Sequence, residues 1–194
     1  MYVRDAKNRD EVWLLDHIEA MGLDSEAFRS RDYVIAVDEE TNDRAGFGRI
    51  RIHKHEDGDS CELTGIGVLD DWRGQGVGAH VVERLLSEAS DNGFETVYSF
   101  TDQPNYLAQF GFDPVESTAL PDHVAGRLAR KADALDAEVV ALRIAVDDFE
   151  MPARLREAFK YAASETPATT GEEERPEDFG IDPDSATYKY DTGN

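Results

Sequence analysis

The segment Arg73-Gly74-Gln75-Gly76-Val77-Gly78 limits the fold more than any other part of the sequence. The residues before it, Cys61–Leu69, have strand character, and apolar residues recur at helical spacing after it, at Ala79, Val82, Leu85, Leu86 and Ala89. Glycines let backbone N–H groups turn inward, and the N-terminus of a helix adds a partial positive charge. The pattern predicts a strand, loop and helix unit that cradles the phosphate groups of a ligand.

Two familiar phosphate-binding loops do not fit this segment. The loop lacks the Gly-Lys-Ser/Thr ending that nucleoside triphosphate sites use. Its three glycines alternate, so they also lack the G-x-G-x-x-G spacing of dinucleotide sites. Nucleoside triphosphates and NAD are therefore disfavoured as ligands.

The residues before the loop predict helices followed by a meander of strands. Asn8 and Asp10 precede a helix with Val12, Leu15, Ile18 and Met21 on its apolar face, closed by Gly22. We expect a shorter helix over Ser25–Ser30. Three antiparallel strands follow, separated by turn-rich clusters, over Tyr33–Asp38, Gly46–His55 and Cys61–Leu69.

The residues after the loop continue an α/β pattern. The helix that follows the loop ends at Asn92-Gly93, and the next expected elements are a strand over Thr96–Phe100, a short helix over Pro104–Phe110, a short strand at Val115, a helix over Pro121–Ala134 and a strand over Glu138–Val146. We expect one α/β domain over residues 1–149, with a mixed sheet of about six to seven strands flanked by helices. Residues 150–194 form a C-terminal extension, which begins with a helix over Met151–Ala163 and continues as an acidic segment whose composition is typical of disorder. Phe179, Ile181, Tyr188 and Tyr190 are residues of that segment that could dock onto the domain.

The charge of the chain indicates its solvent and excludes one class of partner. The 42 acidic residues outnumber the 20 basic ones and are spread along the 194 residues, which gives a net charge of -22. Concentrated salt screens the repulsion between such charges. We therefore expect a cytoplasmic protein of a halophile, with an ordinary acidic mesophilic protein as the alternative. Nucleic-acid binding through a basic surface is disfavoured.

The single cysteine and the apolar patterning exclude several further classes. Cys61 alone forms neither an intrachain disulfide nor a cysteine-based zinc site, so we expect it in the core, and nothing else indicates a metal. The N-terminus lacks the apolar stretch of a secretion signal, and no segment approaches the roughly 20 apolar residues of a membrane span. We expect an intracellular protein that does not bind a membrane.

Two segments at the expected separation carry a family resemblance. Val68–Gly78 resembles the acetyl-CoA signature of the GNAT acetyltransferase superfamily, except that Asp70 replaces the usual proline. Asn105–Phe112 resembles the second recurring element of that family, an aromatic-rich helix that ends in Gly-Phe. The order of the predicted elements fits the GNAT fold over roughly residues 2–146. The resemblance implies a GNAT member, which with the acidic composition we expect to be from a halophilic archaeon.

The resemblance also implies which residues contact acetyl-CoA as cosubstrate. In that family the pyrophosphate lies on the loop amides, and the pantetheine arm lies between the strand before the loop and the strand after the helix. The implied contacts are Ile66, Gly67 and Val68 through their backbone groups, the loop residues Arg73, Gly74, Gln75, Gly76, Val77 and Gly78, and Asn105.

An acidic residue and a basic row are candidates for handling the acceptor. Glu62 lies six residues before Val68 and resembles the general-base glutamate of histone-type members of the superfamily, with an ordinary surface carboxylate as the alternative. Arg49, Arg51, His53 and His55 share one face of the neighbouring strand by their period of two. This row either grips an anionic substrate or forms a solvated face that balances nearby acids.

The general acid is not assigned by the resemblance. Many relatives protonate the departing CoA thiolate with a tyrosine at the position that Leu107 occupies here. Tyr106 is adjacent, but one residue on a helix turns a side chain by about 100°. Tyr106 is therefore a candidate acid with a packing role as its alternative, and a thiol with a pKa near 8.5 also takes a proton from water.

These expectations lead to one function and one alternative. The chain is predicted to transfer acetyl from acetyl-CoA to a primary amine of a small metabolite, such as an amino acid, or of a protein. The alternative is a non-catalytic sensor that binds acyl-CoA, in which the C-terminal extension contacts a partner. A homodimer is one expected arrangement.

Overall fold

The computed structural model describes residues 1–135 and 138–162 of the 194-residue chain. The acidic part of the C-terminal extension, including the predicted docking residues Phe179, Ile181, Tyr188 and Tyr190, lies outside the described residues.

A seven-stranded sheet forms the centre of the described domain, in the order β1-β2-β3-β4-β5-β7-β6. Its only parallel pair is β4 with β5, and all other neighbours are antiparallel. The strands are β1 Tyr2–Asp5, β2 Tyr33–Val37, β3 Arg44–His53, β4 Ser60–Val68, β5 Thr96–Thr101, β6 Asp113–Pro114 and β7 Val140–Ala145. The structure confirms the predicted mixed sheet flanked by helices.

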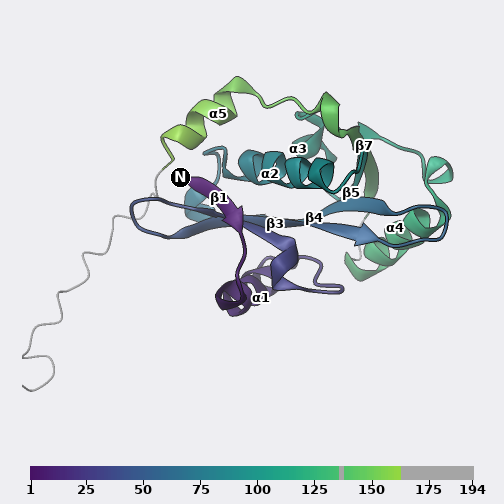
Figure 1. Cartoon of the computed structure of the whole chain (residues 1–194), viewed down its shortest axis with the longest axis horizontal. Helices are drawn as coiled ribbons and strands as arrows, with labels where there is room; N and C mark the ends of the chain where they lie inside the picture. The colour runs from purple at the N-terminus through teal and green to yellow at the C-terminus, as the bar shows by residue number, and fades with distance from the viewer. Residues whose placement is uncertain (136–137, 163–194) are drawn as a thin grey trace, which may run out of the picture. The chain divides into compact units, whose positions relative to one another are not determined.

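Five α-helices of the described residues cover the two faces of this sheet (Figure 1). They are α1 Glu11–Ala20, α2 Val77–Asp91, α3 Pro104–Ala108, α4 Asp122–Leu135 and α5 Ala153–Lys160. In Figure 1, α2 and α5 lie on one side of the strands, and α1 and α4 lie on the other. The crossover through α2 makes β4 and β5 parallel, because the helix carries the chain back to the same end of the sheet.

The apolar stripe of α2 anchors the main core. Val81, Val82, Leu85, Leu86 and Ala89 are buried, and this face packs against β3 and β4. Their spacing repeats every three to four residues, which turns them all to one side of the helix. The glycine-rich loop is thereby fixed to the N-terminal end of a helix that cannot shift without exposing this stripe.

The apolar face predicted for the first helix is only partly confirmed. Ile18 is buried in α1 as predicted, but Val12 is 70% exposed and Leu15 is 39% exposed, and Leu14 is buried in their place. Leu14 and Ile18 stand one helical turn apart and pack in one cluster with Phe47 of β3, so the core-facing side is rotated from the predicted one.

The predicted short helix over Ser25–Ser30 is absent from the described residues. Its place is taken by a turn and a three-residue 3-10 helix, Ser30–Asp32. Ala27 has φ 51°, which lies in the left-handed region and interrupts a right-handed helix. A smaller difference concerns Val115, which follows β6 and donates its backbone N–H to Ala141 O at 2.9 Å.

Candidate functional site

The parallel strands β4 and β5 separate partway along their length. They pair at only three positions, from Cys61 with Val97 to Leu63 with Ser99. Beyond Leu63, β4 continues to Val68 while pairing with β3 alone. The backbone groups on the open edge of β4 therefore have no ladder partner in β5, and they line a gap between the two strands.

An irregularity in β4 accompanies this separation. The register between β3 and β4 shifts between Phe47 and Arg49, opposite Gly65. Gly65 has φ 62°, a conformation that residues with a Cβ rarely adopt. Such a bulge bends the strand and redirects its N–H groups. It lies at the point where β4 leaves β5, so the sequence Thr64-Gly65-Ile66-Gly67 aims backbone donors into the gap.

The glycine-rich loop stands beside this gap and opens α2. Gly76 is the N-cap of α2 at φ 77°, and the first helical bond runs from His80 N to Gly76 O. The N–H groups of Val77, Gly78 and Ala79 precede that bond and have no intrahelical acceptor. Together with the partial positive charge of the helix end, they suit a pyrophosphate group.

Two of the three loop glycines are required by close neighbours. A Cβ on Gly76 would lie 2.2 Å from the backbone oxygen of Leu155, which belongs to α5. A Cβ on Gly78 would lie 2.3 Å from the hydroxyl of Tyr106. Helix α5 thus packs directly against the loop, and it is fixed there by Phe159, whose ring stacks on His80 at a centroid distance of 3.7 Å.

A cavity of about 910 Å³ joins the loop, the strand gap and the segment after α1. We call it the large cavity. Among the residues predicted to contact the cosubstrate, those that line it are Ile66, Gly67, Val68, Arg73, Gly74, Gly76, Val77 and Gly78. Gln75 and Asn105 are not lining residues. Its size is within the range of small-molecule sites, and its two ends differ in chemistry, with helix amides at one end and charged side chains at the other.

The candidate acid Tyr106 and its neighbour Leu107 both line the large cavity. The Tyr106 side chain lies over Gly78 with its ring edge against Phe110, and Leu107 is the more buried of the two. Burial raises the pKa of Tyr106 to about 12. The phenol is therefore protonated at neutral pH and can donate a hydrogen bond or a proton.

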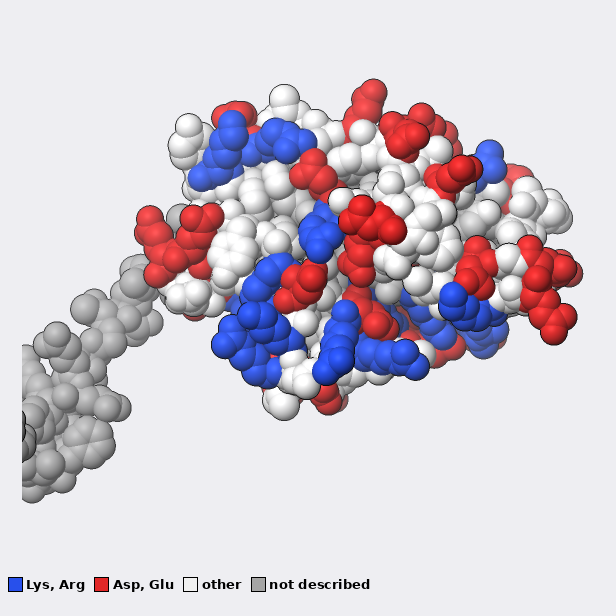
Figure 2. Space-filling model, in the orientation of Figure 1, with Lys and Arg blue, Asp and Glu red and all other residues white. Residues whose placement is uncertain are grey.

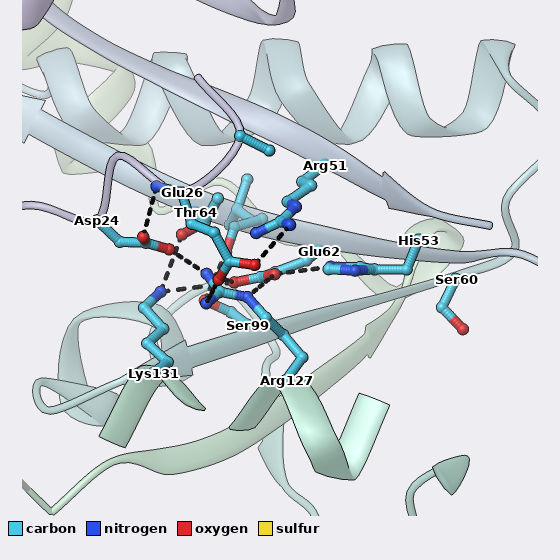
Figure 3. A network of polar contacts seen from close by, with 12 residues as sticks. Asp24, Glu26, Arg51, His53, Ser60, Glu62, Thr64, Ser99, Arg127 and Lys131 are labelled. Carbon is cyan, nitrogen blue, oxygen red and sulfur yellow. Dashed lines mark hydrogen bonds and ion pairs between the residues drawn. The ribbon is translucent and has the colours of Figure 1, made fainter. Parts of the chain in front are cut away.

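Glu62 is fully enclosed and engaged by several basic groups (Figure 3). Arg127 Nε donates to Glu62 Oε2 at 2.9 Å, His53 Nε2 lies 2.8 Å from the same oxygen, and Lys131 Nζ lies 3.6 Å from Oε1. Burial alone would raise the pKa of Glu62, but His53, Lys131 and Arg127 together lower it to about 2. Glu62 is thus a buried carboxylate, not the surface carboxylate of the alternative interpretation, and it does not line the large cavity.

Arg127 and Lys131, both from α4, are site residues that the sequence analysis missed. Arg127 is 1% exposed and also contacts Asp24 and, at 2.8 Å, Glu26. Lys131 is 6% exposed and donates to Thr64 Oγ1 at 2.9 Å. Two basic residues one helical turn apart on an otherwise apolar helix face were the available signal. What the sequence did not supply was the packing of α4 over β4.

The end of the large cavity away from the loop is walled by α4 and the segment after α1. Met21, Leu23 and Asp24 come from that segment, and Lys131 and Leu135 come from α4. Burial lowers the pKa of Lys131 from its ordinary value, an effect that Glu62 opposes. This end therefore offers an apolar floor with one carboxylate and one buried amine.

The basic row predicted on β3 is divided by the structure. Arg49 is fully buried and donates to the backbone oxygens of Glu26 and Ala27, and Arg51 pairs with the Glu26 side chain at 3.0 Å. His53 faces Glu62, whereas His55 lies beyond the end of β3. The solvated-face interpretation is wrong for Arg49, because the segment 24–28 covers it.

Three other features are absent from the described residues: an accessible cysteine, a group of metal ligands and a membrane-spanning helix. Cys61 is buried, and burial raises the pKa of its thiol to about 12, as expected of a core cysteine. Within residues 1–135 and 138–162, no group of three or more His, Cys, Asp or Glu side chains is placed to hold a metal. No helix in the same ranges has the length and apolar character to cross a membrane.

Several solved structures with a similar fold contain coenzyme A or an analogue of it. N-acetylglutamate synthase from Neisseria gonorrhoeae, complexed with coenzyme A and N-acetyl-glutamate, has a TM-score of 0.62 and 14% identity over 74% of this chain, which spans only 34% of that protein. Rv2747 from Mycobacterium tuberculosis, in complex with CoA and NLQ, has a TM-score of 0.59 and 19% identity over 75% of this chain and 99% of its own. Naa50 from Arabidopsis thaliana, bound to the bisubstrate analogue CoA-Ac-MVNAL, has a TM-score of 0.53 and 14% identity over 74% and 97% of the two chains.

These similarities establish the fold, and a family model establishes the family. No curated protein sequence matches the chain. The model of the acetyltransferase (GNAT) family matches residues 3–112, which is more than half of the 194 residues and includes both the glycine-rich loop and the Gly-Phe element. The chain therefore belongs to the GNAT family of acetyl-CoA-dependent acetyltransferases.

Proposed function

We propose that this protein transfers the acetyl group of acetyl-CoA to the primary amine of a small metabolite. The observation that carries the proposal is the gap between β4 and β5, which opens directly beside the amides at the N-terminus of α2. The loop residues Arg73–Gly78 would hold the pyrophosphate, and the pantetheine arm would lie in the gap. Backbone groups of Ile66, Gly67 and Val68 would bind its amides.

The bulge at Gly65 supports a role for β4 in the chemical step. As the amine attacks the thioester, negative charge develops on the carbonyl oxygen, and a fixed N–H aimed at that oxygen stabilises the transition state. The redirected donors next to Gly65 suit this task because the strand already holds them in place. The nitrogen–carbon bond then forms as the amine gives up its proton to a water chain, the carbon–sulfur bond breaks, and CoA leaves as the thiolate.

Charged groups at the far end of the large cavity support an amino acid as acceptor. Asp24 suits an ammonium group and Lys131 suits a carboxylate, and both line this end. The structural neighbour from Neisseria gonorrhoeae is an N-acetylglutamate synthase complexed with N-acetyl-glutamate, which agrees with such an acceptor. A protein amine is the alternative acceptor, consistent with the peptide-like analogue bound to Naa50.

We further propose that Glu62 positions the acceptor end and is not itself the base. Its pKa of about 2 makes the carboxylate a weak proton acceptor, and Arg127 and His53 already engage it. By holding Arg127 and Lys131, Glu62 would fix the positive charges that orient the carboxylate of an amino-acid acceptor. Tyr106 is the proposed acid: with a pKa of about 12 its phenol keeps its proton at neutral pH and would stabilise the leaving thiolate chiefly by donating a hydrogen bond to it.

The acidic composition supports two further parts of the proposal. A net charge of -22 suits a protein that works at high ionic strength, and we propose a halophilic archaeal source and a cytoplasmic location. We also propose that the protein forms a homodimer. A measurement of its molecular mass in high-salt solution tests this.

Calorimetry followed by a thiol-release assay tests the main proposal. Acetyl-CoA is titrated into the native chain and into Gly76→Trp in high salt, and thiol release is then measured with a panel of amino acids, polyamines and peptides. We expect binding by the native chain, loss of binding in the variant and release with at least one amino acid. Absence of binding by the native chain would refute the proposal. Binding without release for any amine would favour the acyl-CoA sensor instead, which the leucine at position 107 also favours.

A further inference from the structure

A second cavity, of about 470 Å³, lies between the end of β3 and α4. It is lined by Arg51, Ile52, His53, Lys54, His123, Gly126 and Arg130, and we call it the basic cavity. We propose that the basic cavity binds a small multivalent anion, a phosphate or a polycarboxylate, at a site separate from the acetyl-CoA site. The volume is within the range of small-ligand pockets.

The lining of the basic cavity contrasts with the rest of the chain. Five of its seven lining residues are arginine, lysine or histidine, and none is acidic. In the whole sequence, acidic residues outnumber arginine and lysine by 42 to 20. Acidic side chains outside the lining balance part of this charge, since Arg51 and Arg130 lie 3.0 and 3.9 Å from Glu26 and Lys54 lies 2.5 Å from Asp59. Acidic and basic side chains are interspersed on the face that Figure 2 shows, whereas the charged groups of the lining itself are all basic. The lining therefore suits an anionic ligand.

Acidic residues behind the wall hold its basic groups in position. Arg51 Nη2 donates to Glu26 at 3.0 Å, and His53 Nε2 lies 2.8 Å from the buried Glu62. These two contacts fix the side chains of Arg51 and His53, so an anion would meet basic groups that are already in position.

His123 is the lining residue whose charge depends most clearly on its neighbours. Its Nε2 lies 2.9 Å from Ser60 Oγ, and its ring stacks on His55 at a centroid distance of 4.4 Å. Burial, His55 and His53 lower the pKa of His123, while Asp57 and Asp122 act in the opposite direction. Anion binding should therefore strengthen when the pH falls far enough to protonate His123, which the lowered pKa places below the ordinary range of histidine.

The basic cavity is distinct from the large cavity, since no residue lines both. The ion pair of Glu62 with Arg127 lies in the buried network that joins their walls (Figure 3). Helix α4 contributes consecutive residues to the two sites, Arg130 to the basic cavity and Lys131 to the large cavity. An anion in the basic cavity would hold α4 against β3 without occupying the acetyl-CoA site.

Calorimetric titration with inorganic phosphate and with citrate tests the proposal. Titrations of the native chain at pH 5 and pH 8, at one chloride concentration, are compared with His123→Gln and Arg130→Gln. Arg9→Gln removes an exposed arginine elsewhere, and Arg73→Gln removes the arginine of the glycine-rich loop, where phosphate could also bind. We expect each cavity variant to weaken binding about tenfold and both controls to match the native chain.

The results separate the proposal from its alternatives. Tighter binding of either anion at pH 5 than at pH 8, lost in the two cavity variants, supports it, and the preferred anion identifies the ligand class. Failure of both anions to bind would overturn the proposal, as would equal weakening by Arg73→Gln. Acetyl-CoA titration of His123→Gln and Arg130→Gln is expected to match the native chain, so loss of the anion site is distinguishable from failure of the proposed function. Arg130→Lys, which keeps the charge, controls for misfolding and should bind within about threefold of the native chain.

Discussion

Glu62 and Arg127 form an ion pair in which each side chain is only 1% exposed, with Arg127 Nε 2.9 Å from Glu62 Oε2. The two residues are 65 positions apart and join β4 to α4. Asp24 and Glu26 contact the same guanidinium from the segment after α1. One arginine therefore connects three parts of the chain around the acceptor end of the large cavity.

Removal of this arginine should strongly destabilise the fold. Arg127→Met leaves Glu62 and Asp24 without their main counter-charge, and breaking a buried pair from one side costs about 3–5 kcal/mol. The measurement is the free energy of unfolding from urea denaturation in high salt. Arg143→Met, at an exposed position on β7, is the matched control and should cost less than about 1 kcal/mol. Equal effects of the two substitutions would contradict the structural role of Arg127.

Acidification should unfold the protein through Glu62. A carboxylate whose pKa is lowered by folding adds stability above its unfolded pKa, near 4.5, and this stability is lost as pH falls toward the folded pKa of about 2. The expected loss is on the order of 3 kcal/mol between about pH 5 and pH 2. Unfolding free energies measured over this range should show a flatter slope in Glu62→Gln. Asp16→Asn, at an exposed position of α1, should keep the native slope.

A methyl group at the N-cap of α2 should disrupt the cosubstrate loop. In Gly76→Ala, the new Cβ would lie 2.2 Å from Leu155 O, so α5 or the loop must move, and we expect acetyl-CoA affinity to fall at least tenfold. Gly93→Ala is a matched control, because Gly93 also has a positive φ but open space around it. The control should lose about 1 kcal/mol of stability and keep its affinity. Calorimetric titration of acetyl-CoA into both variants measures the two affinities.

Loss of the Tyr106 hydroxyl tests its proposed role as the acid. In Tyr106→Phe the ring still covers Gly78, so acetyl-CoA binding should be retained, while kcat falls by about tenfold to a hundredfold. A decrease that becomes smaller with an acyl donor whose thiol is more acidic would link the hydroxyl to thiolate protonation. Unchanged kcat at all pH values would leave Tyr106 a packing residue. The assay is thiol release at saturating acceptor.

The strand and helix order was predictable because it depends on local patterns. The glycine-rich loop follows an apolar strand and precedes the apolar stripe of α2, and each of these signals lies within a few residues. The short helix expected over Ser25–Ser30 was wrong because Ala27 adopts a positive φ imposed by its surroundings, with Arg49 bound to its carbonyl oxygen. No local pattern records such a contact.

The acceptor end was less predictable for the same reason. Glu62 was identified by its distance from Val68, but its environment depends on Arg127 and Lys131, which stand 65 and 69 positions later. A long-range pairing of this kind is fixed by how α4 packs over the sheet. Local periodicity predicted helix α4, but it did not predict that α4 packs over β4.

The carbonyl of Leu155 against Gly76 joins the most recognisable loop of the chain to a segment beyond the family match, which ends at residue 112. Substitutions in α5 should therefore affect the loop, although α5 lies outside the residues that the family model matches. In a genetic screen, substitutions at Leu155 or Phe159 should cluster by phenotype with loop substitutions. Examining the loop alone would overlook the half of this contact that α5 supplies.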